Sequence, residues 1–303
     1  MRELGGTPRP PKRNSTWPTR RSTARCAAPV LNRQVQGREV ERRLAGVRTV
    51  LDVGAGTGAF SIPLAQRGFA VTHVNFSPAM LVLARRKAMV YSRGGSHAAG
   101  PQAWEPALLQ NLQFVEANAA ALPLPDRSFD LVLNMDGAIS FCGSLAEQAL
   151  QETCRVIRKM LILTVSHRAW MIPIWVSASV KVAERLLPAV GAMFERGEWH
   201  QKQFPDNPLL SKGVTQDYFP GFRAFLPGEL RAILEKAGMR VLRCGGLGAL
   251  ANFCGPEAVE QVCQDEALFQ DSLDLCERFD QEVLPNGPGT KQRAGLVAVA
   301  VPE

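Results

Sequence analysis

The chain has 303 residues, of which 46% are hydrophobic, and its formal net charge is +7. This length and apolar content predict one large globular domain, or a domain with an insertion. No secretory signal is apparent, and the apolar run at 169–180 is too short to cross a bilayer. The charge is uneven, because the first 43 residues carry +8 and the remainder carries −1. The body of the chain is therefore nearly neutral.

The basic N-terminal segment, residues 1–30, is rich in Arg, Pro, Ser and Thr and shows no apolar periodicity. This composition predicts a disordered extension. Its charge would suit nucleic acid or an anionic membrane surface, and it also resembles an organellar transit segment, although its prolines spoil an amphipathic helix. An unstructured extension or a misassigned start is the simpler interpretation. From residue 31 to 44, evenly spaced apolar residues predict a leading helix near the ligand site.

Residues 50–58, with the sequence VLDVGAGTG, combine an apolar strand with a glycine-rich turn. Such a strand is typical of the centre of a parallel sheet. Glycines at alternate positions permit a tight turn and a close approach of the backbone to a ligand. A helix predicted at 59–67 would point its first amides at the same place. The spacing G-x-G-x-G differs from the dinucleotide spacing G-x-G-x-x-G and favours a cofactor with a single adenosine unit.

Three later stretches extend this pattern. Residues 69–81 predict a second strand and the start of a helix, with Ser77 as its N-cap and Pro78 in its first turn. Residues 122–133 predict the approach to a fourth strand, and residues 225–239 predict a late helix and the turn into another strand. In this order, the four stretches resemble the class I S-adenosylmethionine-dependent methyltransferases, in the small-molecule branch similar to ubiquinone and menaquinone biosynthesis enzymes.

The resemblance implies an α/β fold with a doubly wound, Rossmann-like, seven-stranded mixed sheet. Residues 31–303 would form the methyltransferase domain. Further strands are predicted at 111–115, 129–134, 160–165 and 295–300. Helices are predicted at 146–158 and 256–268, with another helix after it through residue 279, and a surface connection is predicted at 92–110. Family members usually carry a Pro-Gly-Gly turn before strand five, whereas this chain would join helix and strand directly through Arg158 and Lys159.

Residues 169–225 have no counterpart in the minimal fold and are predicted to form a substrate cap inserted after strand five. The segment is rich in aromatic residues, namely Trp170, Trp175, Phe194, Trp199, Phe204, Tyr218, Phe219, Phe222 and Phe225. These rings could wall a pocket for a hydrophobic substrate, or they could simply cover the sheet. Because Lys and Arg do not alternate with them, a single-stranded nucleic-acid platform is disfavoured.

The resemblance also assigns roles to individual residues. Asp52 would organise the glycine turn. The aminoacyl and ribose side of S-adenosylmethionine would contact the glycine turn, at Gly54, Ala55, Gly56 and Gly58. The ribose and adenine would contact Asn75 and Phe76, and the adenine would also contact Asn118 and Ala119. Met135 would face the cofactor as well.

Two of these positions depart from the family pattern, because Asn75 and Asn118 stand where carboxylates usually contact the ribose and the adenine. An Asn oxygen still accepts a hydrogen bond, but without charge assistance. Each change would weaken cofactor affinity roughly tenfold. A degenerate, non-methylating member of the fold would show such changes.

Candidate catalytic residues follow strands four and five or lie in the cap. Asp136 and Ser140 come after strand four, at the ligand-facing end of the sheet. Asp136 would touch either the methionine end of the cofactor or the substrate. Alternatively, it would serve only as a turn residue. His167 could act as a general base, orient a substrate carboxylate together with Arg168, or play a structural role. Tyr218 is a polar-tipped aromatic residue that could reach the substrate, as could Trp199 and His200.

The predicted reaction is in-line methyl transfer to a small, partly apolar acceptor. Seven cysteines without a C-x-x-C pair predict reduced thiols in a cytoplasmic protein, and neither they nor the four scattered histidines form a metal-binding pattern. A non-methylating protein on the same fold remains open, either cyclase-like or regulatory. An RNA methyltransferase that captures its substrate through the basic segment is less favoured. The acceptor and the oligomeric state are not determined by the sequence.

Overall fold

The computed structural model describes residues 27–93, 110–200, 221–250, 254, 256–287, 289 and 295–303. Most of the basic N-terminal segment lies outside these residues, as does most of the connection predicted at 92–110.

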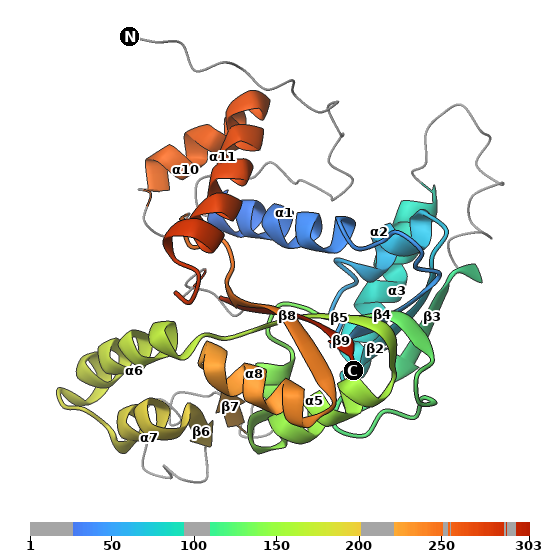
Figure 1. Ribbon diagram of the computed structural model, residues 1–303. Coiled ribbons are helices and arrows are strands. Elements are labelled where there is room, and N and C mark those ends of the chain that lie inside the picture. The colour runs from blue at the N-terminus through green and yellow to red at the C-terminus, as the bar shows by residue number, and fades with distance from the viewer. Residues whose placement is uncertain are drawn as a thin grey trace.

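A seven-stranded mixed sheet forms the centre of the structure (Figure 1). Its strands are β1 (Thr49–Val53), β2 (Ala70–Asn75), β3 (Leu112–Glu116), β4 (Phe129–Asn134), β5 (Ile157–Val165), β8 (Met239–Gly246) and β9 (Leu296–Pro302). The spatial order is β3-β2-β1-β4-β5-β9-β8, with β9 antiparallel to both of its neighbours and the other neighbouring pairs parallel. The predicted doubly wound, Rossmann-like fold is confirmed.

Both faces of the sheet are buried, which explains why its central strands are mostly apolar. Successive side chains of a strand point to opposite faces. Val50 and Leu131 accordingly belong to one hydrophobic cluster, and their neighbours Leu51 and Val132 belong to the other. The carboxyl ends of β1, β2 and β4 lie side by side because these strands are parallel and adjacent.

Four helices contribute apolar residues to the first cluster: α1 (Ala27–Glu41), α2 (Ser61–Gln66), α3 (Pro78–Arg93) and α11 (Glu266–Arg278). The second cluster receives α5 (Ala146–Arg155) and α8 (Pro227–Lys236). In Figure 1, α1 lies between the sheet and the pair formed by α10 (Pro256–Gln264) and α11. The first helix of the chain therefore packs against elements that come more than two hundred residues later.

The chain between β5 and α8 forms α6 (Arg168–Ala183), α7 (Pro188–Arg196) and a two-stranded ladder of β6 (Glu198–His200) and β7 (Gly221–Arg223). This ladder packs against η2 (Ile139–Leu145), the 3₁₀ segment that follows β4. A short π-helical turn, η4 (Phe279–Val283), continues α11. The segment predicted as a cap thus contacts the loop after β4, while its role over an acceptor stays a prediction.

Several predicted boundaries shift by a few residues. The leading helix begins at Ala27 and not at residue 31, so it takes in the last part of the segment predicted to be disordered. The helix predicted at 59–67 is shortened to α2, because the glycine turn extends to residue 60. Strand five begins at Ile157, so Arg158 and Lys159 lie within the strand and do not join it to α5. Both side chains pair there with the buried Asp130.

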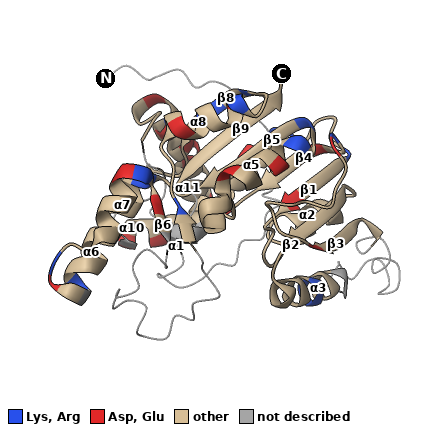
Figure 2. Cartoon of the chain, turned by 90° about the horizontal axis from the view of Figure 1, so that it is seen from below, with Lys and Arg blue, Asp and Glu red and all other residues tan. Residues whose placement is uncertain are grey.

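Acidic and basic residues are interspersed over the described helices and strands, as Figure 2 shows. Ion pairs such as Arg155 with Asp126 and Arg223 with Glu198 join charges of opposite sign. This agrees with the nearly neutral body predicted from the sequence.

Candidate functional site

The glycine turn leaves β1 in a conformation that few other residues adopt. Gly54, Gly56 and Gly58 have φ values of +69°, +55° and +80°. A Cβ atom at Gly54 would lie 2.3 Å from the Cβ of Ala138, whereas a Cβ at Gly56 would meet no atom within 4 Å. Gly54 therefore permits contact with the loop after β4. The backbone at Gly56 faces open space, as expected where a ligand approaches.

Neighbouring strand ends carry the residues predicted to contact ribose and adenine. The backbone oxygen of Asn75 accepts a hydrogen bond from Ala117 N at 3.2 Å, which brings the chain after β3 beside the end of β2. Asn75 is buried, whereas the next residue, Phe76, is 69% exposed. An exposed aromatic ring at this edge is suited to stacking on a flat base.

Asn75 and Asn118 make the same local hydrogen bond. The Oδ1 atom of Asn75 accepts from Ser77 N at 2.9 Å, and that of Asn118 accepts from Ala120 N at 2.9 Å. Each amide oxygen has a second lone pair and each amide nitrogen can donate, so both side chains can still bind a ligand. Both asparagines therefore stabilise a turn and remain compatible with the predicted cofactor contacts.

Asp136 lies at the end of β4 and forms an ion pair that the sequence did not predict. Its carboxylate pairs with Arg33 of α1, 103 positions earlier in the chain. The Arg33 guanidinium also lies 4.9 Å from the ring centroid of Phe60, just after the glycine turn. Met135 is buried beside Asp136, which itself has a φ of +58°. The leading helix is thereby attached to the loops that follow β1 and β4.

A buried polar chain lies beneath the glycine turn. Ser61 N donates to Asp52 Oδ2 at 3.1 Å, and Ser61 Oγ lies 2.7 Å from His73 Nδ1. Burial raises the pKa of Asp52 to about 7, although its hydrogen bonds with Ser61 oppose this shift. Burial lowers the pKa of His73 to about 4, partly offset by the Gly56 backbone. Asp52 therefore stabilises the start of α2 directly after the turn, in line with its predicted role.

His167 and Arg168 follow β5 and are both buried. His167 Nδ1 accepts a hydrogen bond from Ala169 N at 3.1 Å and thus caps α6. Burial lowers the pKa of His167 to about 4. Arg168 Nη2 lies 2.7 and 2.6 Å from the two carboxylate oxygens of Glu229. Arg168 is therefore already paired within the protein, and the alternative in which it orients a substrate carboxylate loses its support.

The structure brings together most of the residues predicted from the sequence. Four of these residues lie at the ends of strands that are neighbours in the sheet, namely Gly54 at β1, Asn75 at β2, Asn118 at β3 and Met135 at β4. Ser140, which follows them in η2, accepts a hydrogen bond from Ser166 N at 2.9 Å through its hydroxyl oxygen. Tyr218 lies outside the described residues.

Sequence reasoning missed two side chains of this region, Arg33 and His73. His73 carried a signal, since it is a polar residue inside an apolar strand and therefore needs a buried partner. Arg33 carried none, because its partner is distant in the sequence.

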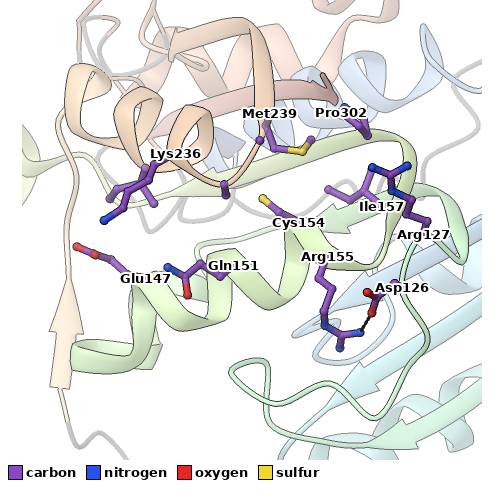
Figure 3. A pocket seen from close by; sticks show the side chains of 13 residues that line it. Asp126, Arg127, Glu147, Gln151, Cys154, Arg155, Ile157, Lys236, Met239 and Pro302 are labelled. Carbon is purple, nitrogen blue, oxygen red and sulfur yellow. Dashed lines mark hydrogen bonds and ion pairs between the residues drawn. The ribbon is translucent and has the colours of Figure 1, made fainter.

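A further pocket lies away from the strand ends that carry the predicted site residues. Figure 3 shows it between α5 and α8, lined by residues such as Arg155, Lys236 and Met239. Ile157 and Met239 begin β5 and β8, so this pocket lies at the amino ends of these strands, opposite the glycine turn. It does not include any residue predicted to bind the cofactor or the acceptor.

Within the described part of the chain, His, Cys, Asp and Glu residues form no group of three that could hold a metal ion. Among the same residues, no helix is both long and apolar enough to cross a membrane.

The strand order, the glycine turn and the residues at four neighbouring strand ends define the class I S-adenosylmethionine-dependent methyltransferase fold. Comparison with known families agrees, because residues 51–163 match the methyltransferase domain family. This match runs from β1 to β5 and includes the glycine turn, Asn75, Asn118 and Asp136. The matched residues 51–163 are therefore similar to a methyltransferase domain.

Individual relatives indicate which branch of the methyltransferases the chain resembles. A demethylmenaquinone methyltransferase of Thermus thermophilus is 36% identical over 112 residues, covering 36% of this chain and 42% of the relative. Another, from Shouchella clausii, is 27% identical and covers 63% of this chain and 70% of the relative. A ubiquinone/menaquinone biosynthesis C-methyltransferase of Xanthomonas oryzae pv. oryzae is 30% identical, covering 48% and 53%. The predicted resemblance to the quinone-biosynthesis branch is confirmed, although the match spans less than half of the Thermus relative's length.

Solved structures support the fold over most of the chain. A methyltransferase structure from Methanosarcina mazei has a TM-score of 0.51 at 17% identity, covering 87% of this chain and 96% of that one. A structure from Mesorhizobium loti has a TM-score of 0.50 at 16% identity, covering 89% and 98%.

Proposed function

We propose that this chain transfers a methyl group from S-adenosylmethionine to a small, partly apolar acceptor of the quinone or hydroquinone class. The observation that carries the proposal is the grouping of the glycine turn, Asn75, Asn118 and Asp136 at adjacent strand ends within the methyltransferase domain. The acceptor class is taken from relatives named as demethylmenaquinone and ubiquinone/menaquinone methyltransferases.

The residues at the strand ends fit this cofactor. The open side of Gly56 leaves room for the ligand, and the exposed ring of Phe76 offers a face for adenine. Asn75 and Asn118 keep hydrogen-bonding capacity for the ribose and the adenine amine. When bound, S-adenosylmethionine supplies a methyl group on a positively charged sulfur, which leaves as a neutral thioether as the acceptor's nucleophile attacks in line.

Positioning provides most of the catalysis in this proposal, since the methyl group is already activated. Asp136, held by Arg33, lies where the cofactor's methionine end and the acceptor meet. His167 is neutral near pH 7 because burial lowers its pKa to about 4. Since its Nδ1 atom accepts a hydrogen bond from Ala169 N, the ring hydrogen lies on Nε2, so in this proposal His167 donates a hydrogen bond to an acceptor oxygen and does not act as a base.

The test is calorimetric binding of S-adenosylmethionine and S-adenosylhomocysteine to the intact chain and to the Asn75→Asp and Asn118→Asp variants. We expect micromolar binding by the intact chain. Each variant should bind S-adenosylmethionine up to about tenfold more tightly, because a carboxylate restores charge-assisted hydrogen bonds. Asp265→Asn, at the exposed N-cap of α11, is the matched control and should leave the affinity unchanged.

Product analysis then tests the transfer itself. Incubation with S-adenosylmethionine and a hydroquinone lacking a ring methyl should yield a product heavier by one methyl group in place of one hydrogen. If only the aspartate variants bind the cofactor, the non-methylating interpretation replaces this proposal.

A further inference from the structure

Three of the buried polar atoms that have no hydrogen-bond partner among the described residues belong to side chains of α6 and β6. They are the Nε1 atoms of Trp175 and Trp199 and the hydroxyl oxygen of Ser179. The two indole rings contact each other, with centroids 5.2 Å apart and planes inclined by 30°. Ser179 follows Trp175 by four positions and therefore lies on the same side of α6, one turn further along. These three residues will be called the Trp–Ser–Trp cluster.

The Trp–Ser–Trp cluster is connected to the loop that carries Asp136. Trp199 pairs with Phe222 across the β6–β7 ladder, and the Phe222 ring meets the Phe141 ring edge-on at 5.3 Å. Phe141 belongs to η2, which begins three residues after Asp136. Aromatic residues therefore follow one another from α6 through the β6–β7 ladder to η2, the segment after β4.

Packing alone does not explain the chemistry of the cluster. A buried donor without a partner destabilises a fold, and Phe or Ala would fill similar space without this penalty. Ser179 is fully buried, so water does not reach its hydroxyl from the surface. The indole nitrogens only donate, and the hydroxyl can donate as well. Their missing partners are thus hydrogen-bond acceptors, next to aromatic faces.

We propose that the Trp–Ser–Trp cluster is the ring-binding part of the acceptor site. It would hold a flat aromatic or quinonoid ring whose carbonyl or hydroxyl oxygens accept hydrogen bonds from Trp175, Ser179 and Trp199. This inference rests on the proposed function, because it places the acceptor of the methyl transfer. It makes the three residues determinants of acceptor specificity, separate from the cofactor-binding strand ends.

The experiment measures binding of 2,3-dimethyl-1,4-naphthoquinone to the full chain saturated with S-adenosylhomocysteine. Both reactive ring carbons of this probe are blocked, so cysteine thiols do not add to it. Calorimetry is used because its signal is independent of tryptophan. We expect Ser179→Ala, Trp175→Phe and Trp199→Phe each to weaken binding of the probe about fivefold or more, since each removes one hydrogen bond to the ring oxygens.

Thermal unfolding separates this role from a structural one. Ser179→Ala should raise the melting temperature while it weakens binding, because it removes an unpaired buried hydroxyl. The matched control is Thr153→Val, since the Thr153 hydroxyl is buried but donates to Ala149 O at 2.7 Å. This control should lower the melting temperature and leave binding of the probe unchanged.

The inference is overturned if Ser179→Ala and Trp199→Phe bind the probe as tightly as the native chain. It is also overturned if the native chain binds S-adenosylhomocysteine but not the probe. By contrast, a native chain that binds neither S-adenosylmethionine nor S-adenosylhomocysteine would contradict the proposed function itself.

Discussion

Asp52 and His73 have opposite effects on the pH dependence of stability. The pKa of Asp52 rises from 3.8 to about 7 on folding, so its contribution to stability is lost as the pH rises through this window. The pKa of His73 falls from 6.5 to about 4, so its contribution to stability grows as the pH rises through a similar window. Both groups are buried and joined through Ser61. Their pH effects on the native chain therefore partly cancel.

Replacing Asp52 should expose this cancellation. Asp52→Asn keeps an oxygen that can accept from Ser61 N but removes the ionisation. The melting temperature of the variant, relative to the native chain, should therefore increase between pH 5 and pH 8. Differential scanning calorimetry at several pH values measures this difference, with Asp271→Asn as an exposed control. A temperature difference independent of pH would show that Asp52 ionises like an ordinary carboxyl group.

Gly54 and Gly46 allow the steric requirement of the glycine turn to be separated from backbone strain. Their φ values are similar, +69° and +71°, but a Cβ at Gly54 would lie 2.3 Å from Ala138 Cβ, while one at Gly46 meets nothing within 4 Å. Gly46→Ala should destabilise the fold by about 1 kcal/mol through strain alone.

Gly54→Ala should lower the melting temperature further and weaken binding of S-adenosylhomocysteine, because the loops after β1 and β4 must move apart. Thermal unfolding and calorimetry measure the two effects. Equal melting temperatures for the two variants would contradict the close approach at Gly54.

At the scale of elements, several ion pairs attach α1 to the rest of the fold, and two of these attachments can be compared. Arg38 pairs with Asp274 and hydrogen-bonds Gln270 of α11, whereas Arg33 pairs with Asp136 at the end of β4. The first attachment joins two helices, and the second joins α1 to the candidate site. Arg33 is therefore a residue of α1 that contacts the candidate site directly.

Arg33→Met should loosen this second attachment. A partly exposed ion pair and a cation–π contact contribute roughly 1 kcal/mol each at most, so amide exchange in α1 should speed up by up to about thirtyfold, with weaker binding of S-adenosylhomocysteine. Hydrogen exchange by mass spectrometry and calorimetry test both effects. Arg38→Met is the matched control. In this variant the amide hydrogens of α1 and α11 should exchange faster, while the affinity for S-adenosylhomocysteine should stay unchanged. Equal cofactor affinities in the two variants would indicate that Arg33 does not act on the site.

At the scale of the whole molecule, the basic segment and the cofactor site should be independent. The residues predicted to contact the cofactor lie between Asp52 and Asp136, far along the chain from the basic segment. Removing residues 1–26 should therefore leave the affinity for S-adenosylhomocysteine unchanged within about twofold. A loss of tenfold or more would mean that this segment forms part of the site. Salt-dependent RNA binding that disappears with the segment would instead support the RNA methyltransferase alternative.

Local patterns in the sequence were sufficient to predict the sheet and the group of residues at its strand ends. The apolar strand before Gly54 and the cap at Ser77 are encoded by neighbouring residues, and the methyltransferase resemblance supplied the strand order. Pattern and turn chemistry act over a few positions, so a sequence displays them directly. Boundaries shifted where a tertiary contact decided them, as at Ile157, where β5 begins early beside β4.

Contacts between distant residues were decided only by the tertiary structure. Arg33 meets Asp136 across 103 positions, Arg168 meets Glu229 across 61, and Trp175 meets Trp199 across 24. No periodicity or spacing encodes such pairs, because they arise when packing of α1 and α6 brings separate segments together. The sequence by itself therefore determined the class of fold and which residues lie at the ends of β1 to β4. The partners of Asp136 and Arg168 and the Trp–Ser–Trp cluster required the folded chain, since burial and distance exist only there.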